Sequence, residues 1–420
     1  MRMRVLPFVL SGLLPCPGSA VPAPPSPEPP LALVHVAVVD VAAGSVLPDR
    51  TVLVSGGRIA EVFPSRASAV PSDARVVDLA GKYVVPGLWD MHVHLSDAGE
   101  RALGMLVESG VLGVRDLGSE IGQIDSWRDA IAKRSRVGPE IVRAGPVVDG
   151  PNPGAPHRLT LRTAGEARCT VTTLKNGLGV DWIKVHASLA REPFFALLAE
   201  ARADRIPVAC HLPTSATAAE ASEHGCRTLE HAAESLIATW GYERVHPSKS
   251  PEESADRLVG EPGRRLFEVL RRNRTWVDPT LVGYESFVKM GRDPEETQAR
   301  QAILDKQILA VGIMHRMGVR LLAGTDLSDD EMGLTPGDSL HRELEYLVKS
   351  GLTPPEALRV ATRDAAEVLG RLAETGTVEK GKRADLVILD ADPLAEVANL
   401  RRISAVVLRG KLLPKGESKP

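Results

Sequence analysis

The sequence predicts an α/β protein: a (β/α)8 TIM barrel with a small β-sandwich domain built from N- and C-terminal segments. Three observations support this fold class. Eight short apolar runs alternate with segments of 3.6-residue helical spacing in the middle of the chain. Strand-like runs separated by glycine and proline occupy both ends. The length of 420 residues is enough for one large barrel and a smaller satellite domain.

The N-terminal segment differs from the rest of the chain. Arg2 and Arg4 precede a mainly apolar run at 5–14, and small residues follow at 18–20. This order is typical of a secretory signal peptide, so we expect residues 1–20 to direct export to the periplasm or the medium. A cytoplasmic protein with an N-terminal tail is the alternative. The apolar run is too short for a stable membrane span. The proline-rich residues 21–30 predict an extended linker.

The predicted β-sandwich combines the two ends of the chain, residues 31–85 and 373–413. Strand-like runs occur at 33–41, 51–54, 58–62, 75–79, 83–85, 384–389 and 403–408. Neither end has enough apolar sequence to fold well alone. We therefore expect the two ends to complete one domain, with the barrel inserted between them and residues 414–420 as a tail.

The predicted barrel covers residues 86–372. Its strands are expected at 88–92, 112–117, 140–144, 182–185, 207–210, 228–230, 275–277 and 320–323. Helical spacing is clearest at 191–203 and 302–317. In such a barrel the functional side chains stand at the C-terminal ends of the strands, on one rim.

Composition and charge exclude several classes of partner. Hydrophobic residues make up 43% of the chain and charged residues 25%, which is ordinary for a soluble globular protein. The net charge is −3 and no basic block is long enough to suggest a nucleic-acid or membrane-surface partner. A small molecule is the expected partner. The sequence leaves the oligomeric state open, a homo-oligomer included.

Cysteine usage is sparse. Apart from Cys16, the chain has Cys169, Cys210 and Cys226, which cannot all pair with one another, and it has no C-x-x-C motif. This argues against a zinc knuckle or a redox pair. We expect buried free thiols.

Residues that can bind a metal recur at the predicted strand ends. His92 and His94 lie two apart on the first strand, so their imidazoles point to the same face. Further groups stand at the ends of strands 4, 5, 6 and 8: Lys184, His211, His231 and Asp326. Imidazole nitrogens and a carboxylate oxygen suit Zn²⁺, or Mn²⁺, Co²⁺ or Ni²⁺, whereas Ca²⁺ prefers mostly oxygens. The sequence therefore predicts a metal site on the rim.

These residues and two longer motifs resemble the amidohydrolase superfamily. Val-Val-Pro-Gly-Leu-Trp-Asp-Met-His-Val-His at 84–94 opens the barrel, and Gly-Lys-Arg-Ala-Asp-Leu-Val-Ile-Leu-Asp at 381–390 closes the small domain. The segments at 114–118, 183–185 and 340–344 are most similar to its imidazolonepropionase-like and prolidase-like branch, which includes Xaa-Pro and Xaa-Arg dipeptidases.

The resemblance implies a binuclear centre. It assigns His92, His94 and Asp326 to the more buried metal, and His211 and His231 to the second. Lys184, carboxylated on its amine, would be the bridging ligand, since a carbamate converts a repelled ammonium into an anion. The implied chemistry uses a metal-bridging hydroxide, with Asp326 as general base and then general acid. His231 would assist if it is not fully engaged as a ligand.

Five further residues are candidates for substrate contact. Arg115 follows the second strand, where a structural ion pair with Asp116 is the alternative. The others, in predicted loops or at helix starts near the rim, are His157, His186, Tyr284 and His341. The acidic residues 329–331 would favour a cationic substrate group, with a solvated loop as the alternative.

The leading hypothesis is a metal-dependent hydrolase that cleaves an amide or peptide bond of a small substrate, a dipeptide or an N-acyl amino acid. The alternative is a cyclic-amide hydrolase of the imidazolonepropionase kind, or a lactonase. Deaminases on this barrel usually carry a glutamate shortly after the histidine of the fifth strand, but residues 212–215 after His211 include none. Deamination is therefore disfavoured, and it would also leave Lys184 unexplained. A non-enzymatic binding module is disfavoured because every expected ligand is present.

Overall fold

The computed structural model describes residues 29–66, 70–151, 156–231, 251–329, 332–414 and 416. The predicted signal peptide, most of the predicted linker and nearly all of the predicted tail lie outside these residues, as do Asp330 and Glu331.

Parallel strands at the centre of the molecule form a three-stranded and a seven-stranded sheet. Strands β6, β7 and β8 pair in that order, and β9, β11, β12, β13, β14 and β15 pair in that order. Strand β9 continues the course of β8 along the chain and pairs with the short β10. The bounds are β6 Leu88–Val93, β7 Val111–Asp116, β8 Glu140–Arg143, β9 Val147–Asp149, β10 Arg158–Thr160, β11 Ile183–Val185, β12 Val208–Cys210, β13 Thr228–Glu230, β14 Trp276–Asp278 and β15 Arg320–Leu321.

Backbone contacts join the first barrel strand to the segment that follows the last one. Met91 N–H donates to Ala323, and Asp326 N–H donates to the carbonyl of His92 at 2.9 Å. Gly324 allows this approach, because a Cβ at that position would lie 2.3 Å from Oδ2 of Asp278 and 2.6 Å from Cβ of His92. The (β/α)8 arrangement expected from the alternating pattern is confirmed, and Asp326 is thereby brought next to His92.

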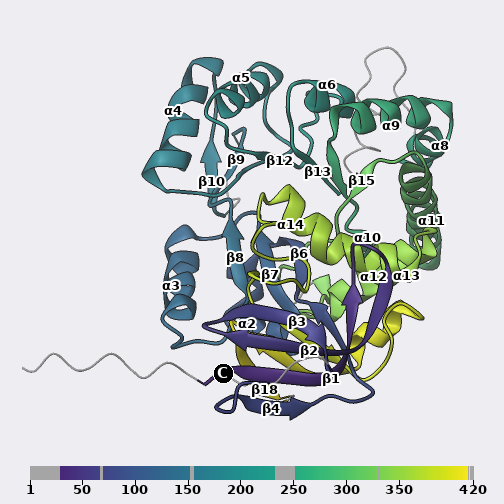
Figure 1. Cartoon of the computed structure of the whole chain (residues 1–420). Coiled ribbons are helices and arrows are strands. Elements are labelled where there is room, and N and C mark those ends of the chain that lie inside the picture. Colours follow the sequence, from purple (N-terminus) through teal and green to yellow (C-terminus); the bar gives the residue numbers. More distant parts are fainter. Residues whose placement is uncertain are drawn as a thin grey trace, which may run out of the picture.

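Helices cover the outside of the barrel (Figure 1). Helix α5 begins and ends where its apolar spacing predicts, and it buries Phe194, Leu197 and Ala201 on one face. The helices are α1 Leu95–Ala98, α2 Arg101–Glu108, α3 Ile121–Ala132, α4 Ala167–Thr172, α5 Arg191–Ala203, α6 Ala218–Glu223, α8 Pro251–Val259, α9 Glu261–Asn273, α10 Leu281–Lys289, α11 Pro294–Arg316, α12 Asp338–Lys349, α13 Pro354–Arg359 and α14 Ala365–Val368, with short 3-10 or π turns η1 Ala164–Glu166, η2 Thr173–Gly177, η4 Val360–Asp364 and η5 Val397–Arg401.

The two ends of the chain share one eight-stranded sheet beside the barrel (Figure 1). Antiparallel pairing of β16 with β5 joins the C-terminal strands to the N-terminal ones. The strands of this terminal sheet are β1 Leu31–Asp40, β2 Ser45–Ser55, β3 Arg58–Pro64, β4 Arg75–Asp78, β5 Tyr83–Pro86, β16 Leu386–Leu389, β17 Ile403–Leu408 and β18 Lys411–Pro414. Valine, leucine and isoleucine from both ends form its core.

The barrel has a core of its own inside the strands. Trp89, Trp182 and Trp276 pack there with Met91 and Leu322. A larger aliphatic cluster fills the space between the strands and the surrounding helices. Three of the five tryptophans of the chain therefore lie in the barrel interior, below the rim.

The prediction of buried free thiols is wrong for all three cysteines: two are not free, and the third is not buried. Cys210 and Cys226 form a disulfide, with their Cα atoms 6.4 Å apart, and Cys169 is free but exposed. The pairing arises because β12 and β13 are neighbours in the sheet. Cys210, the last residue of β12, therefore lies beside Cys226, two residues before β13. Separation along the chain does not reveal this.

Among the helices of the described residues, none is both long enough and apolar enough to cross a membrane.

Candidate metal centre

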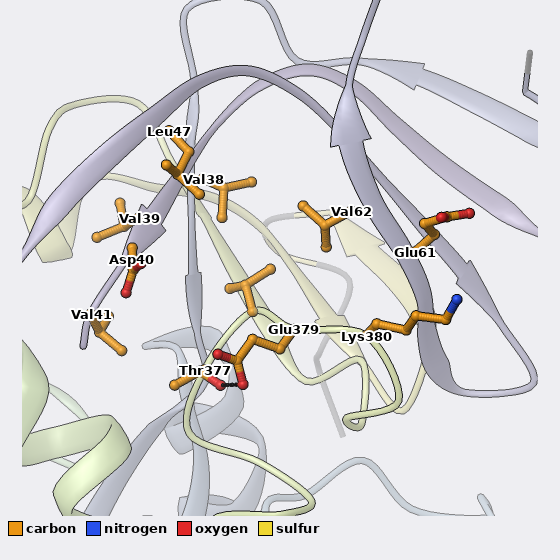
Figure 2. A pocket seen from close by; sticks show the side chains of 11 residues that line it. Val38, Val39, Asp40, Val41, Leu47, Glu61, Val62, Thr377, Glu379 and Lys380 are labelled. Carbon is orange, nitrogen blue, oxygen red and sulfur yellow. Dashed lines mark hydrogen bonds between the residues drawn. The ribbon is translucent and has the colours of Figure 1, made fainter. Parts of the chain in front are cut away.

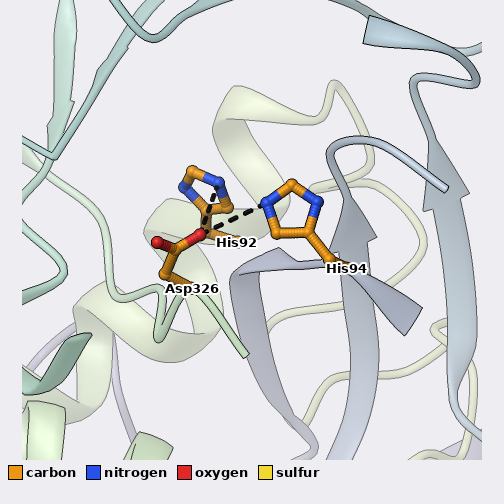
Figure 3. Close-up of side chains that lie close together, drawn as sticks. All are labelled: His92, His94 and Asp326. Carbon is orange, nitrogen blue, oxygen red and sulfur yellow. Dashed lines mark ion pairs between the residues drawn. The ribbon is translucent and has the colours of Figure 1, made fainter. Parts of the chain in front are cut away.

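Three predicted ligands meet at the C-terminal ends of β6 and the last barrel strand. Oδ1 of Asp326 lies 3.3 Å from Nε2 of His92 and 3.2 Å from Nε2 of His94. Figure 3 shows both imidazoles turned toward this carboxylate. One ligand atom from each residue falls within 4.8 Å of the others, as a common metal ion requires.

Lys184 reaches the same point from β11. Its Nζ is 3.0 Å from Nε2 of His92, and the residue is 1% exposed. Burial lowers the pKa of this amine to about 8, although the carboxylates of Glu230 and Asp326 oppose the shift. The amine is thus much less basic than a lysine in water.

His211 and His231 complete the cluster. Their ring centroids are 5.0 Å apart, and the His231 ring is 4.6 Å from that of His92. Nδ1 of His231 lies 3.1 Å from Oγ1 of Thr280 and 3.7 Å from Oδ2 of Asp326. The structure therefore brings all six predicted ligands together.

The backbone is strained at three neighbouring strand ends. His231, Thr280 and Asp326 have φ values of 52°, 46° and 61°, in the left-handed region that non-glycine residues rarely adopt. Thr280 is β-branched, which makes this conformation still less favourable. Such strain clusters at functional sites, because it directs side chains where regular strands would not.

The electrostatics favour neutral imidazoles at most ligand positions. Burial lowers the pKa of His92 to about 3 and lowers the pKa values of His211 and His231 well below normal. In His94 burial also acts to lower the pKa, but the contact with Asp326 outweighs it and the net shift is upward. Neutral imidazole is the form that binds metal ions.

The donor set fits a divalent transition metal. Four imidazoles, one carboxylate and one buried amine converge, and nitrogen-rich sets of this kind suit Zn²⁺ and its neighbours. A second group, His92, Glu230 and Asp278, also lies within 4.8 Å. The Arg115 guanidinium lies 2.9 Å from Glu230 and 3.7 Å from Asp278. Its positive charge already compensates these two carboxylates, so this group needs no metal ion.

Three of the five tentative substrate residues lie near the cluster. His186 stacks on His211 with centroids 4.2 Å apart, and its Nδ1 is 3.5 Å from the buried Asp149. His157 is 3.9 Å from Asp97, just after His94. Tyr284 lines a small recess shared with His231, Asp326, Pro279, Thr280, Gly283, Phe287 and Gln307.

The other two candidates are buried and contact the protein itself, so their roles in substrate binding stay predictions. Arg115 lies within β7, fully buried, and its ion-pair partner is Glu230 rather than Asp116. His341 is 4% exposed, and its Nε2 is 2.9 Å from the carbonyl of Ser109 at the end of α2. Both were placed near the rim from chain position alone, which does not define the direction of a side chain.

Sequence reasoning missed the carboxylates that support the ligands. Glu230 lies 3.2 Å from Nδ1 of His92, and Asp90 accepts hydrogen bonds from the backbone and hydroxyl of Thr325, next to Asp326. Asp90 alternates with His92 and His94 along the strand, and Glu230 directly precedes His231. An acidic residue inside a buried strand next to a ligand was the available signal.

One cavity lies away from the cluster. It has a volume of about 380 Å³ and is in the terminal sheet, lined by valines, Leu47 and the charged residues Asp40, Glu61, Glu379 and Lys380 (Figure 2). Thr377 donates to Glu379 at 2.8 Å across its edge. Because the strained strand ends and the converging ligands are on the barrel rim, the chemistry is assigned there.

Comparisons with known proteins agree with this geometry. A sequence profile of the Amidohydrolase family matches residues 83–413. An imidazolonepropionase of Rubrobacter xylanophilus is 27% identical over 402 residues, covering 87% of this chain and 91% of the relative. A crystal structure of a proposed prolidase from Bifidobacterium longum has a TM-score of 0.74 and 27% identity, over 92% and 95% of the two chains. A Xaa-Pro dipeptidase with bound methionine has the same fold, with a TM-score of 0.72, 20% identity and coverage of 92% and 100%.

Proposed function

The chain belongs to the amidohydrolase family and is a hydrolase of carbon–nitrogen bonds, and from this premise we propose that it cleaves the amide bond of a dipeptide or an N-acyl amino acid. The observation that carries the proposal is the buried amine of Lys184, 3.0 Å from His92 in the middle of the cluster. Burial of an amine beside histidines is unfavourable without a partner, and a carbamate that bridges two ions would provide one.

We propose that the cluster holds two divalent ions. Zn²⁺ is the leading candidate, and Co²⁺, Mn²⁺ and Ni²⁺ are the alternatives. His92, His94 and Asp326 would hold the first ion and His211 and His231 the second, with carboxylated Lys184 between them. Bound ions supply Lewis-acid polarisation of the scissile carbonyl and a nucleophilic water at neutral pH.

The side chains of this chain supply the proton transfers. Asp326 has one carboxylate oxygen near His92 and His94, and the other 3.7 Å from Nδ1 of His231. Burial raises the pKa of Asp326, but the neighbouring His231 and His92 outweigh it and hold this pKa well below its ordinary value. Asp326 is thus ionised and able to accept a proton from the attacking water, then return it to the leaving nitrogen.

Hydrolysis of a cyclic amide is the second candidate. The similarity to an imidazolonepropionase over 87% of this chain favours it. The same ligands and the same proton carrier would serve both reactions, because each breaks a carbon–nitrogen bond beside a carbonyl.

The first test is metal content per chain, measured by elemental analysis on protein prepared with bicarbonate and zinc. We expect about two ions in the parent protein and one or fewer in Lys184→Ala, since a bridging ligand serves both ions. The parent is then assayed against dipeptides, N-acyl amino acids and cyclic amides. One ion in both proteins would contradict the binuclear proposal, and turnover of cyclic amides alone would favour the second candidate.

We also propose that the protein is exported. The charged, apolar and small residues of 1–20 support this, and so does the Cys210–Cys226 disulfide, because such bonds persist mainly in oxidising compartments. N-terminal sequencing of the protein from its native cell fraction tests the proposal. A mature chain that still begins at Met1 in the cytoplasm would contradict it.

A further inference from the structure

Resting on the proposed assignment of His92 as a metal ligand, we propose that Glu230, fixed by Arg115, is the positioning residue that orients the His92 imidazole toward the metal. Neither residue touches the rim where substrate would bind. Both lie in the barrel interior, directly below the ligand cluster, and are 0% exposed.

The contact between Glu230 and His92 defines which imidazole nitrogen faces the rim. Oε2 of Glu230 is 3.2 Å from Nδ1 of His92. An ionised carboxylate has no proton to donate, so this close contact favours the tautomer with the proton on Nδ1. The lone pair is then on Nε2, the atom that lies 3.3 Å from Asp326 and 3.0 Å from Lys184. Carboxylates of this kind orient metal-binding histidines and raise their basicity.

Arg115 leaves Glu230 little freedom. Its Nη2 donates to Oε1 and Oε2 of Glu230 at 3.0 and 2.9 Å, and its Nη1 donates to Thr228 at 3.0 Å. Its Nε donates to the carbonyl of Met91 at 2.7 Å, and the guanidinium lies 4.8 Å from the Trp182 ring. The planar guanidinium of Arg115 therefore connects β7 with β6 and β13, and it holds the carboxylate of Glu230 in one orientation.

The position of Glu230 also connects the two halves of the proposed centre. Glu230 is the last residue of β13 and points into the barrel, and His231 follows it with a left-handed backbone that turns its ring to the rim. Glu230 thus contacts His92 from the barrel interior, and its neighbour in the chain, His231, is itself a proposed ligand. A displacement of the β13 end would disturb both positions together.

Asp278 provides a matched control within the same interior cluster. It is fully buried, and its Oδ2 is 3.7 Å from Nη2 of Arg115, but among the described residues neither of its side-chain oxygens has a hydrogen-bond partner. Asp278→Asn removes one buried carboxylate without touching the contact to His92. Glu230→Gln removes a carboxylate of the same network and places an NH2 group against either Arg115 or His92, both of which are donors.

The test is a Co²⁺ titration of each metal-free protein against a competing chelator, followed by the visible absorption of the bound cobalt. We expect Glu230→Gln to weaken the site of His92, His94 and Asp326 by 10- to 100-fold, on the order seen for such supporting carboxylates, and the other site much less. Asp278→Asn leaves the contact between Glu230 and His92 in place, so its effect on either affinity should be much smaller than that of Glu230→Gln.

A double variant separates positioning from loss of structure. Arg115→Met in the Glu230→Gln background removes both charges, and the loss of cobalt affinity should then be close to that of Glu230→Gln alone, because Arg115 acts through Glu230. ¹⁵N shifts of the His92 ring should report the Nδ1–H form in the parent and its loss in Glu230→Gln. Equal cobalt affinity in parent and Glu230→Gln would overturn this inference alone, whereas a parent protein that binds no metal would overturn the proposed function as well.

Discussion

The amine of Lys184 lies where burial and nearby charges act in opposite directions. Burial lowers its pKa to about 8, and Glu230 and Asp326 limit the shift. Only the neutral amine can react with carbon dioxide to form a carbamate. The fraction of neutral amine in the metal-free protein therefore changes tenfold per pH unit below this pKa.

This titration gives a prediction for reconstitution of the metal-free protein. At constant dissolved carbon dioxide, the initial rate of activation by zinc should rise about tenfold between pH 6 and 7 and level off above pH 8 to 9, since the neutral amine is then the major form. Activity recovered after timed additions measures this rate. Lys184→Ala should show no dependence on carbon dioxide. A flat pH profile in the parent would mean that the lysine is not the group being modified.

At the scale of elements, the ends of β12, β13 and β14 define the rim, and their sequence neighbours stabilise them. The Cys210–Cys226 disulfide connects the end of β12, directly before His211, with the approach to β13. Helix α6 begins soon afterwards with a capping box formed by Thr217 and Glu220. Both features restrict the segment that carries His211.

The disulfide makes a measurable contribution to stability. It closes a loop of 16 residues, so replacing both cysteines by alanine should lower the free energy of unfolding by about 3 kcal/mol. Urea unfolding of the oxidised parent and the double variant measures this difference. Cys169→Ala, at the exposed free thiol, should unfold like the parent. Identical unfolding midpoints with and without reductant would show that the bond does not form.

At the scale of the whole molecule, the ligand cluster joins strands that are far apart in the chain. Residues at the ends of β6, β11, β12, β13 and the last barrel strand approach one another only in the folded barrel. A metal that binds this cluster binds the folded chain and not the unfolded one. Folding and metal binding are therefore linked.

Removal of metal should consequently lower the melting temperature. At a free metal concentration of 100 times Kd, one bound ion stabilises the folded protein by about 2.7 kcal/mol, so treatment with a chelator should lower Tm by several degrees and zinc should restore it. Differential scanning calorimetry measures the shift. Ca²⁺, which prefers oxygen ligands, should not restore Tm. Unchanged melting after complete metal removal would contradict a site built across the barrel strands.

Local sequence pattern was sufficient for the elements and for naming the six candidate ligands. The eight barrel strands lie where apolar runs and turn signals indicated, because strand and helix periods are local properties of the chain. The candidate ligands are recognisable because polar side chains at the C-terminal ends of buried strands gather on the rim of a parallel barrel. These features do not depend on which strands are neighbours across the barrel.

Tertiary structure decided the contacts between strands. The sequence predicts Arg115 near the rim, but in the barrel its side chain faces inward and binds Glu230 on β13. The sequence gives no sign that Cys210 and Cys226 pair. Their disulfide depends on β12 and β13 lying side by side. The sequence by itself determined which residues could bind metal, whereas only folding determined what supports them, because side-chain direction and lateral neighbours depend on the closure of the whole barrel.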